Sequence, residues 1–408
     1  HLPSGGRSLE STLSVWTHVL ESPHTVTTWK MDSPRERDYK RKRWMSFIIV
    51  LGYLFLGGCE YVVILPTVWD YLQTLGVTEE HWLGFTVSTY STAAAISGLI
   101  GGRLADKYYK HTKLLVIAFI SFRVVGNFQY MLGMSVWNII CGRMLCGLGD
   151  GVNGLEPIAE SVVLDKSGNP EIKEKKEESS DFRKYLNDFL TDSFVVLMSL
   201  VFALYFSQMA FETVIPVITQ DNFGFGVREN TFIYMAGGIE ALLTYVGIAF
   251  IGKYVRETTL QFVGWFLILS AQVWLIIVMP HFEKGNQTHM VYFLIGIFLI
   301  YLGSPIASVG NTALSSKVLS NETQGLGQGV RRVIVHLGLI FGPTWAGATV
   351  MKPHLFLGVG ITLMLINGVM LMVSFKSLRQ AEAKMSNTTQ AKPLKTPDES
   401  SPLLPSEP

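Results

Sequence analysis

The stretch GGRLADKYYKHTK, residues 101–113, lies between two long apolar runs and brings an acid and a cluster of bases into one short connection. Charged residues make up only 16% of the 408-residue chain, against roughly 25% in soluble domains, and they gather between apolar runs. A helix that crosses the roughly 30 Å hydrocarbon layer needs about 20 mostly apolar residues. Alternating segments of about ten residues, which a membrane β-barrel requires, are not seen. The sequence therefore predicts an all-α polytopic membrane protein.

The apolar runs predict about ten membrane helices, because a segment within lipid must satisfy its backbone hydrogen bonds internally. Between the fourth and fifth runs the chain is polar and charged, so we expect a cytosolic linker there. Both ends are also polar. The predicted helices are 44–65, 83–102, 114–133, 136–158, 193–217, 230–252, 260–280, 290–314, 329–351 and 354–375. The predicted regions are a disordered cytosolic segment (1–43), a four-helix half (44–158), the linker (159–192), a six-helix half (193–375) and a cytosolic tail (376–408).

The placement of bases predicts the orientation, because short connections rich in Lys and Arg stay in the cytosol. Residues 35–43 hold six bases, and the connection after the second helix holds four. The connections at 67–81 and 133–138 hold none. Both termini are therefore expected in the cytosol. The sequon at Asn286 then falls in a lumenal loop, where it is a candidate glycosylation site.

The chemistry-bearing residues give no sign of an enzyme. Cys59, Cys141 and Cys146 all fall inside apolar runs and are expected to be packing residues, with no disulfide or metal ligand among them. We find no nucleophile elbow, metal-ligand cluster or phosphate-binding glycine loop, so neither a metal nor a cofactor is predicted. The net charge of +1 gives no reason to expect a nucleic-acid partner.

The opening stretch resembles the signature between the second and third helices of major facilitator superfamily transporters, G-x-x-x-D-[RK]-x-G-[RK]-[RK]. Gly102, Asp106 and Lys107 match this pattern, whereas Tyr109 replaces its second glycine and His111 its final base. Asp106 would meet the positive end of the third helix dipole, and the bases would hold the turn at the cytosolic surface.

The fourth helix carries a second resemblance, because Arg143-x-x-x-Gly147-x-Gly149 follows the superfamily pattern R-x-x-x-G-x-G. Arg143 and Gly147 share a helix face, so the small residue makes room beside the cation. A charge at mid-depth costs about 3 kcal/mol. We therefore expect Arg143 to face the interior of the bundle or water.

Three stretches of the second half resemble a lysosomal branch of the same superfamily. They are FETVIPVIT (211–219), GSPIASVGNTALSSKVL (303–319) and QGLGQGVRRVIVHLGLIFGP (324–343). The resemblance implies twelve helices in two six-helix halves, so helices five and six of that plan are expected to be missing here. Helix five packs near the interface between the halves, and its loss would leave the central cavity open on one side. Two explanations of the missing pair remain open. The chain could be a splice form or gene model that lacks the pair, or a rearranged carrier with ten helices.

Ionisable residues inside membrane segments are candidates for the transport pathway. Besides Arg143, these are Glu60 in the first helix, Glu212 in the fifth, Glu240 in the sixth and His336 in the ninth. A carboxyl group in a low-dielectric site can hold a proton near neutral pH, so the acids could couple transport to protons. The alternative for each is a paired or water-facing structural charge.

Two further groups of residues lie near the cytosolic surface. Arg331 and Arg332 start the ninth helix at the level of Asp106, which predicts an ion-pair latch on the cytosolic side. In the tail, Glu399, Leu403 and Leu404 resemble the acidic dileucine signal that clathrin adaptors read on the route to lysosomes.

These features predict a transporter of a small solute across the endolysosomal membrane, with the lipid bilayer and that solute or ion as its partners. The arginines would favour an anion. Two alternatives remain open: a lysosomal anion channel for chloride, and a truncated, transport-deficient form that acts by association with the full-length protein.

Overall fold

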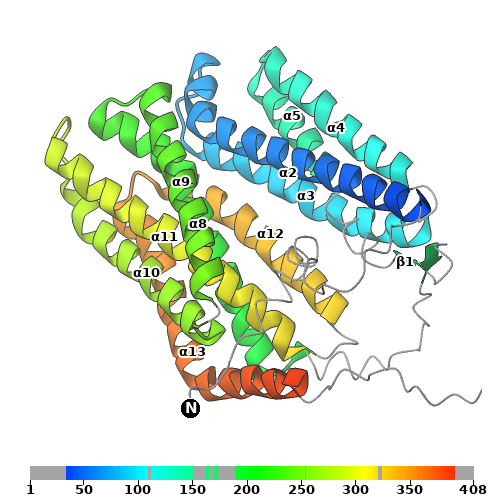
Figure 1. The fold of residues 1–408 in the computed structure, drawn as a ribbon. Helices are drawn as coiled ribbons and strands as arrows, with labels where there is room; N and C mark the ends of the chain where they lie inside the picture. Colours follow the sequence, from blue (N-terminus) through cyan, green and yellow to red (C-terminus); the bar gives the residue numbers. More distant parts are fainter. Residues whose placement is uncertain are drawn as a thin grey trace, which may run out of the picture.

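The structure is a computed structural model that describes residues 34–108, 112–150, 162–164, 170–172, 189–252, 254–319 and 324–390. Within these ranges ten α-helices run back and forth in two groups (Figure 1). The first group comprises α2 (Pro34–Thr74), α3 (His81–Lys107), α4 (Thr112–Leu132) and α5 (Val136–Gly149). The second comprises α8 (Asp192–Phe223), α9 (Val227–Ile251), α10 (Glu257–Val278), α11 (Gln287–Val318), α12 (Gln324–Thr349) and α13 (Pro353–Gln390), with a 3-10 turn, η3 (Met279–His281), after α10.

Seven of the described helices are long and apolar enough to cross a membrane, in line with the predicted polytopic architecture. α5 is apolar but has only 14 residues, which is about 21 Å of helix and short of the roughly 30 Å layer. Ten membrane spans were predicted, and the described residues form ten helices. Seven of these helices have the length and composition needed to cross the membrane. The seven are α3, α4, α8, α9, α10, α11 and α13.

Each predicted helix range overlaps one observed helix, with bounds that differ by up to 15 residues, and α5 is the helix that stops well before the end of its predicted range, 136–158. Within the described residues α5 ends at Gly149, where the amide of Asp150 donates to the carbonyls of Gly147 and Leu148, and residues 151–158 of the predicted range lie outside the described part of the structure. Inside the predicted linker, β1 (Val162–Leu164) pairs antiparallel with β2 (Pro170–Ile172). The polar composition of the linker did not predict this hairpin.

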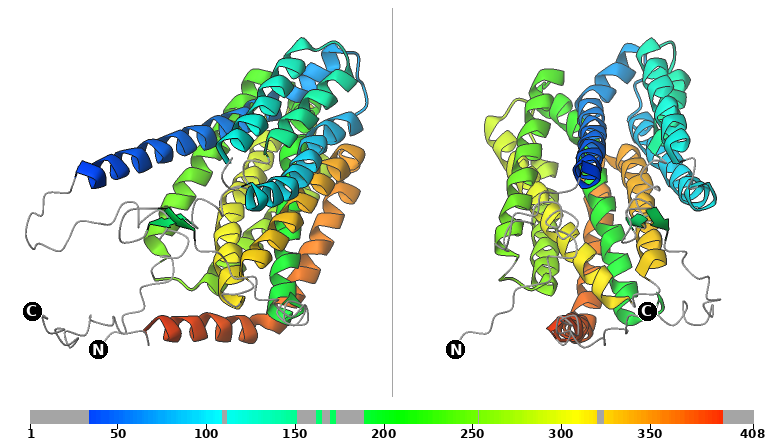
Figure 2. Two further views of the ribbon diagram at one scale, coloured as in Figure 1. Left: turned by 90° about the vertical axis from the view of Figure 1, so that its right-hand side faces the viewer. Right: turned by 45° about the vertical axis from the view of Figure 1, so that its right-hand side comes forward.

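Two of the polar segments are more helical than predicted. α2 begins at Pro34, inside the segment expected to be disordered, and α13 continues through the start of the predicted tail to Gln390. Proline suits the first turn of a helix, and Lys, Arg, Glu, Gln and Ala favour helix even where hydropathy is low. Figure 2 shows the red end of α13 turning away from the rest of that helix.

Local chemistry explains where several helices begin and end. Ser135 accepts a hydrogen bond from the Asn138 amide (3.2 Å) and so caps the start of α5. Asn286 does the same for α11 through the Thr288 amide (3.0 Å). α8 ends at Gly224, whose φ of +69° lies in the left-handed region that glycine adopts without strain.

The two groups of helices meet mainly where α3 packs along α12 (Figure 2). Their backbones approach closely at Gly84, where an added Cβ would lie 2.1 Å from the Pro343 carbonyl oxygen. A buried hydrophobic cluster extends across the junction, with Leu72 of α2, Leu83 of α3 and Val214 of α8 fully enclosed. This junction sets the position of the cavity described below.

The outer surface of the bundle is strongly apolar, as expected for a protein surrounded by lipid. α9 is buried only at Asn230, Tyr234, Gly237 and Ile248, and its remaining described side chains are partly or fully exposed. Of the three cysteines expected to be packing residues, Cys146 is buried, whereas Cys59 and Cys141 are exposed on the surface of their helices.

Candidate functional site

A cavity of about 320 Å³ lies between the two groups of helices. Its wall comes from α2, α3 and α5 on one side and from α8 and α12 on the other. Its lining combines five apolar residues with seven polar ones, so polar groups converge on an enclosed space as in ligand sites generally. Those polar residues are Tyr90, Ser91, Arg143, Asp150, Tyr205, Gln208 and His336.

Arg143 is the buried cation of this cavity, with its side chain only 5% exposed. Its guanidinium lies over the Tyr90 ring, 4.6 Å from the centroid. One turn further along α5, an added Cβ at Gly147 would lie 2.2 Å from the Tyr90 carbonyl oxygen, so the glycine lets α5 approach α3. Arg143 therefore faces the interior as predicted. Its Nε has no hydrogen-bond partner among the described residues.

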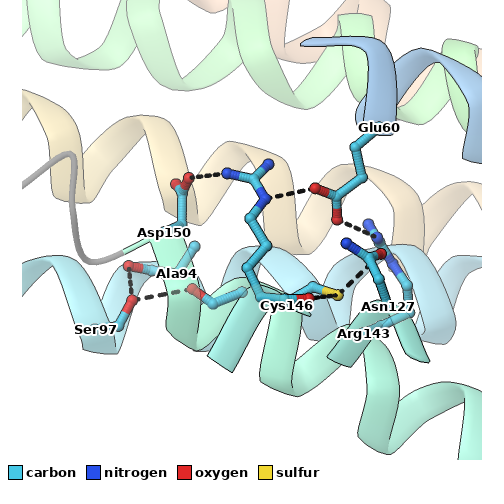
Figure 3. A network of polar contacts seen from close by, with 9 residues as sticks. Glu60, Ala94, Ser97, Asn127, Arg143, Cys146 and Asp150 are labelled. Carbon is cyan, nitrogen blue, oxygen red and sulfur yellow. Dashed lines mark hydrogen bonds and ion pairs between the residues drawn. The ribbon is translucent and has the colours of Figure 1, made fainter. Parts of the chain in front are cut away.

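Glu60 and Arg143 belong to an ionic cluster on α2, α4 and α5 (Figure 3). Arg123 Nε donates to Glu60 Oε2 at 2.5 Å, and Arg123 Nη1 lies 3.8 Å from Asp150 Oδ1. Arg143 Nη1 is 4.0 Å from Glu60 Oε1. The four side chains are each no more than 17% exposed. Two cations thus balance two carboxylates beside the cavity.

Sequence reasoning overlooked Arg123 and Asp150 as site residues. Arg123 is a lone base inside the apolar run of the third helix, and an intramembrane charge is itself a signal of function. Asp150 follows the last residue of α5 and looks like part of a polar connection. Nothing in the sequence shows that Arg123 connects Asp150 to Glu60, because that contact depends on how three helices pack.

His336 and Glu212 approach the cavity from the second group. His336 lines it from α12, and its Nδ1 has no hydrogen-bond partner among the described residues. Glu212 is buried in α8 and accepts a hydrogen bond from Gln208 Nε2 (2.8 Å), while Gln208 itself lines the cavity. The Tyr234 hydroxyl donates to the Glu212 carbonyl. Glu212 is therefore one side chain removed from the cavity.

Glu240 does not share this site. It lies half-buried on α9, which contributes no residue to the cavity wall. Its Oε1 is buried without a hydrogen-bond partner among the described residues.

The residues of the predicted latch occupy the ends of α3 and α12. Gly102, Asp106 and Lys107 form the last two turns of α3, and their side chains lie outside the described part of the structure. Arg331 is held within its own group, because Nε donates to Asn311 Oδ1 (3.1 Å) and Nη2 to Thr312 Oγ1 (2.7 Å) on α11.

The structure describes the predicted glycosylation site but not the predicted sorting signal. Asn286 lies in the turn before α11, where its Nδ2 donates to Glu283 Oε2 (3.0 Å). The tail residues Glu399, Leu403 and Leu404 lie outside the described residues.

The second group contains an ionic cluster of its own, remote from the cavity wall. Lys317 Nζ of α11 lies 2.7 Å from Glu257 Oε1 of α10. Glu382 of α13 accepts from the Glu257 amide (3.1 Å) and from Thr258 Oγ1 (2.7 Å). This cluster ties the ends of α10, α11 and α13 together.

The helices and the cavity define a polytopic all-α membrane protein with a small-ligand cavity between two helical groups. Comparison with known proteins narrows this class further. Residues 161–343 match the family description of the Major Facilitator Superfamily. The solved structure of the human organic anion transporter MFSD10 (TETRAN) is similar, with a TM-score of 0.51, 12% identity, and coverage of 76% of this chain and 95% of that one. The fold is therefore a major facilitator-type bundle.

Two bacterial proteins are similar in sequence. Quinolone resistance protein NorA of Staphylococcus aureus is 23% identical over 369 residues, covering 76% of this chain and 91% of NorA. The multi-drug resistance efflux pump PmrA homolog of Lactococcus lactis is 26% identical over 143 residues, or 34% of each chain.

Proposed function

We propose that the chain is a Major Facilitator Superfamily transporter that moves a small organic anion across the endolysosomal membrane. The observation that carries this proposal is the cavity between the two helical groups, into which Arg143 presents a buried cation with an unpartnered Nε. Buried donors without partners are costly unless a ligand or water satisfies them. A planar guanidinium is well suited to the oxygens of a carboxylate or sulfonate. MFSD10, the protein of similar fold, is an organic anion transporter, which supports the same substrate class.

The helix count fits a family plan from which a helix pair has been lost. The described residues hold four helices before the hairpin and six after it. The NorA alignment runs over 369 positions, more than the 76% of this chain that it covers, so the chain carries gaps relative to NorA. The exposed faces of α9 agree with a missing neighbour on that side. The even helix number would keep both termini in the cytosol.

Lysosomal placement rests on the sequence. The three second-half stretches resemble major facilitator superfamily domain-containing protein 8, and the tail carries Glu399, Leu403 and Leu404 as a candidate clathrin-adaptor signal. A glycan at Asn286 would place the α10–α11 turn in the lumen.

The cytosolic latch is proposed between Asp106 and the Arg331–Arg332 pair. The charge swap is designed at Arg332, because reversing Arg331 would also break its hydrogen bonds to Asn311 and Thr312. Single reversals of Asp106 and Arg332 should each reduce transport, and the combined swap should restore it. Absence of rescue in a flux assay would rule the latch out.

Reconstitution into proteoliposomes tests the proposed function. A carrier should show saturable uptake of naphthalene-1-sulfonate, a permanent monoanion, together with counterflow from preloaded vesicles. An anion channel should instead pass chloride currents far above carrier turnover, without counterflow. A truncated regulator should show neither and should co-purify with a twelve-helix relative. The same assay on a version with the helix pair restored gives the reference level.

A further inference from the structure

Resting on the proposed function, we propose that the cavity between the helical groups binds a small bipolar anion, whose anionic group contacts Arg143 and whose hydroxyl group contacts His336. The substrate class is thus narrowed from organic anions in general to anions with an uncharged polar group at the other end. His336 becomes the residue that sets this specificity. Two buried polar atoms without partners among the described residues, one on each wall of the cavity, carry the proposal.

The two unpartnered atoms belong to different helical groups. Arg143 lies on α5, and its Nε has no hydrogen-bond partner in the described part of the chain. His336 lies on α12, and the same is true of its Nδ1. Both residues line the cavity. Because α5 belongs to the first wall and α12 to the second, a ligand that satisfies both atoms reaches from one helical group to the other.

The other polar side chains of the second wall already have partners. Gln208 Nε2 donates to Glu212 Oε1 (2.8 Å), and the Tyr205 hydroxyl shares a hydrogen bond with Ser308 Oγ (3.2 Å). A polar atom that is enclosed without a partner is costly, so a ligand that supplies the partner is bound more tightly. His336 is therefore the polar group on this wall that gains most from a ligand.

A hydroxyl group fits His336 in either tautomer. In a neutral imidazole one ring nitrogen donates and the other accepts, and a hydroxyl group can do both. The charged groups that act on the ring are Asp150 and Arg332, one of each sign. These surroundings call for no further charge, and an enclosed ionised group without a counter-charge is unfavourable. A neutral hydroxyl group is therefore favoured here over a second anionic group.

The space between the two polar ends suits a compact apolar body. The cavity measures about 320 Å³, at the small end of the roughly 300–1,000 Å³ of ligand pockets. The face of the Arg143 guanidinium lies over the Tyr90 ring, so its edge can meet the anionic group. A ligand of one or two rings, with the anionic and hydroxyl groups on opposite sides, meets these conditions. The apolar residues of the lining are Ile64, Leu65, Val87, Met209 and Leu339.

The test compares three sulfonates in proteoliposomes that contain the full chain. Naphthalene-1-sulfonate has the anionic group alone, 4-hydroxynaphthalene-1-sulfonate adds a hydroxyl group across the ring, and 4-methylnaphthalene-1-sulfonate has a methyl group of similar size there. At mildly acidic pH each carries a single negative charge. We expect the hydroxyl compound to reach half-maximal uptake at a concentration at least about tenfold lower than the methyl compound, because a site that hydrogen-bonds a hydroxyl group discriminates against an analogue without it.

Matched substitutions of histidine locate the preference in the protein. His336→Phe keeps a ring without polar atoms and should take up the hydroxyl and methyl compounds equally well. His336→Asn restores a polar atom near the position of Nδ1 and should recover part of the preference. His354→Phe changes an exposed residue of α13 that does not line the cavity, and it should keep the full preference.

The outcomes separate this proposal from the proposed function. Equal uptake of all three sulfonates by the unmodified protein, as expected if water alone satisfies Nδ1, would overturn the bipolar ligand and leave anion transport intact. That measurement needs no variant, so it decides the matter even if His336→Phe does not fold. A preference that persists in His336→Phe would overturn the role of His336. Absence of uptake of every sulfonate by the unmodified protein would overturn both proposals.

Discussion

The two helical groups each bury a cluster of opposite charges, and the clusters differ in how completely they are satisfied. In the second group, Lys317 lies 2.7 Å from Glu257, and both Glu382 oxygens accept hydrogen bonds at 2.7 and 3.1 Å. In the first group, two of the three ionic contacts are 3.8 and 4.0 Å long, and Arg143 Nε and Glu60 Oε1 lack hydrogen bonds among the described residues. Arg143 and Asp150 of the first cluster line the cavity between the helical groups, whereas Glu257, Lys317 and Glu382 do not. Closed pairs hold helices together, whereas pairs with spare hydrogen-bonding capacity can exchange partners with a ligand.

The largest effect is expected from Lys317→Met, which removes the cation from the closed cluster. Glu257 would be left buried beside Glu382 without its counter-charge, and breaking a buried pair costs about 3–5 kcal/mol. Unfolding of the purified protein in detergent measures this loss, with Lys317→Arg as the charge-preserving control. A stable Lys317→Met protein with impaired anion uptake would reverse the roles assigned to the two clusters.

Arg143→Gln tests the open cluster. We expect naphthalene-1-sulfonate uptake to fall by about 100-fold, because the ligand loses charge-assisted hydrogen bonds of about 1.5–3 kcal/mol. Stability should change much less than in Lys317→Met, since Glu60 keeps Arg123. Arg143→Lys keeps the charge without the planar fork and should retain part of the uptake. Equal loss of folded protein and of uptake in Arg143→Gln would mean that the residue is structural.

Gly84→Ala perturbs the junction that holds both groups in register. The added Cβ would lie 2.1 Å from the Pro343 carbonyl, so α3 and α12 must separate, at a cost of about 1–3 kcal/mol. A lower unfolding temperature together with weaker sulfonate uptake is the expected result. Gly358→Ala on α13 meets no atom within 4 Å and should be neutral or slightly stabilising. Similar behaviour of the two variants would rule out close packing at Gly84.

The smallest effect is expected from Glu382→Gln, which keeps one carbonyl oxygen as an acceptor. Loss of one charge-assisted hydrogen bond should cost about 1–2 kcal/mol and loosen the end of α13. Hydrogen exchange should speed up at residues 376–383 and remain unchanged around Arg143. Faster exchange around the cavity instead would show that the two clusters are coupled.

Hydropathy predicted most of the fold, because each long apolar run forms one helix. It could not predict the helical starts and ends at Pro34 and Gln390, since polar residues with good helix propensity leave no hydropathy signal.

The site was only partly predictable. An intramembrane charge such as Arg143 must face the interior, so its orientation follows from sequence. Its neighbours do not, because Glu60 and Arg123 are 63 residues apart and meet only after α2, α4 and α5 pack. Glu240 was also chosen because it is an ionisable residue inside a membrane helix. Sequence alone could not show that it lies away from the cavity that Arg143 and His336 share.

A structure of the protein determined with naphthalene-1-sulfonate at acidic pH tests the central claim most directly. The sulfonate should lie in the cavity between the helical groups, with its oxygens at the edge of the Arg143 guanidinium and Glu60 withdrawn from Arg143. Density for the sulfonate elsewhere, with Arg143 still facing Glu60 and an empty cavity, would contradict the assignment of this cavity as the anion site.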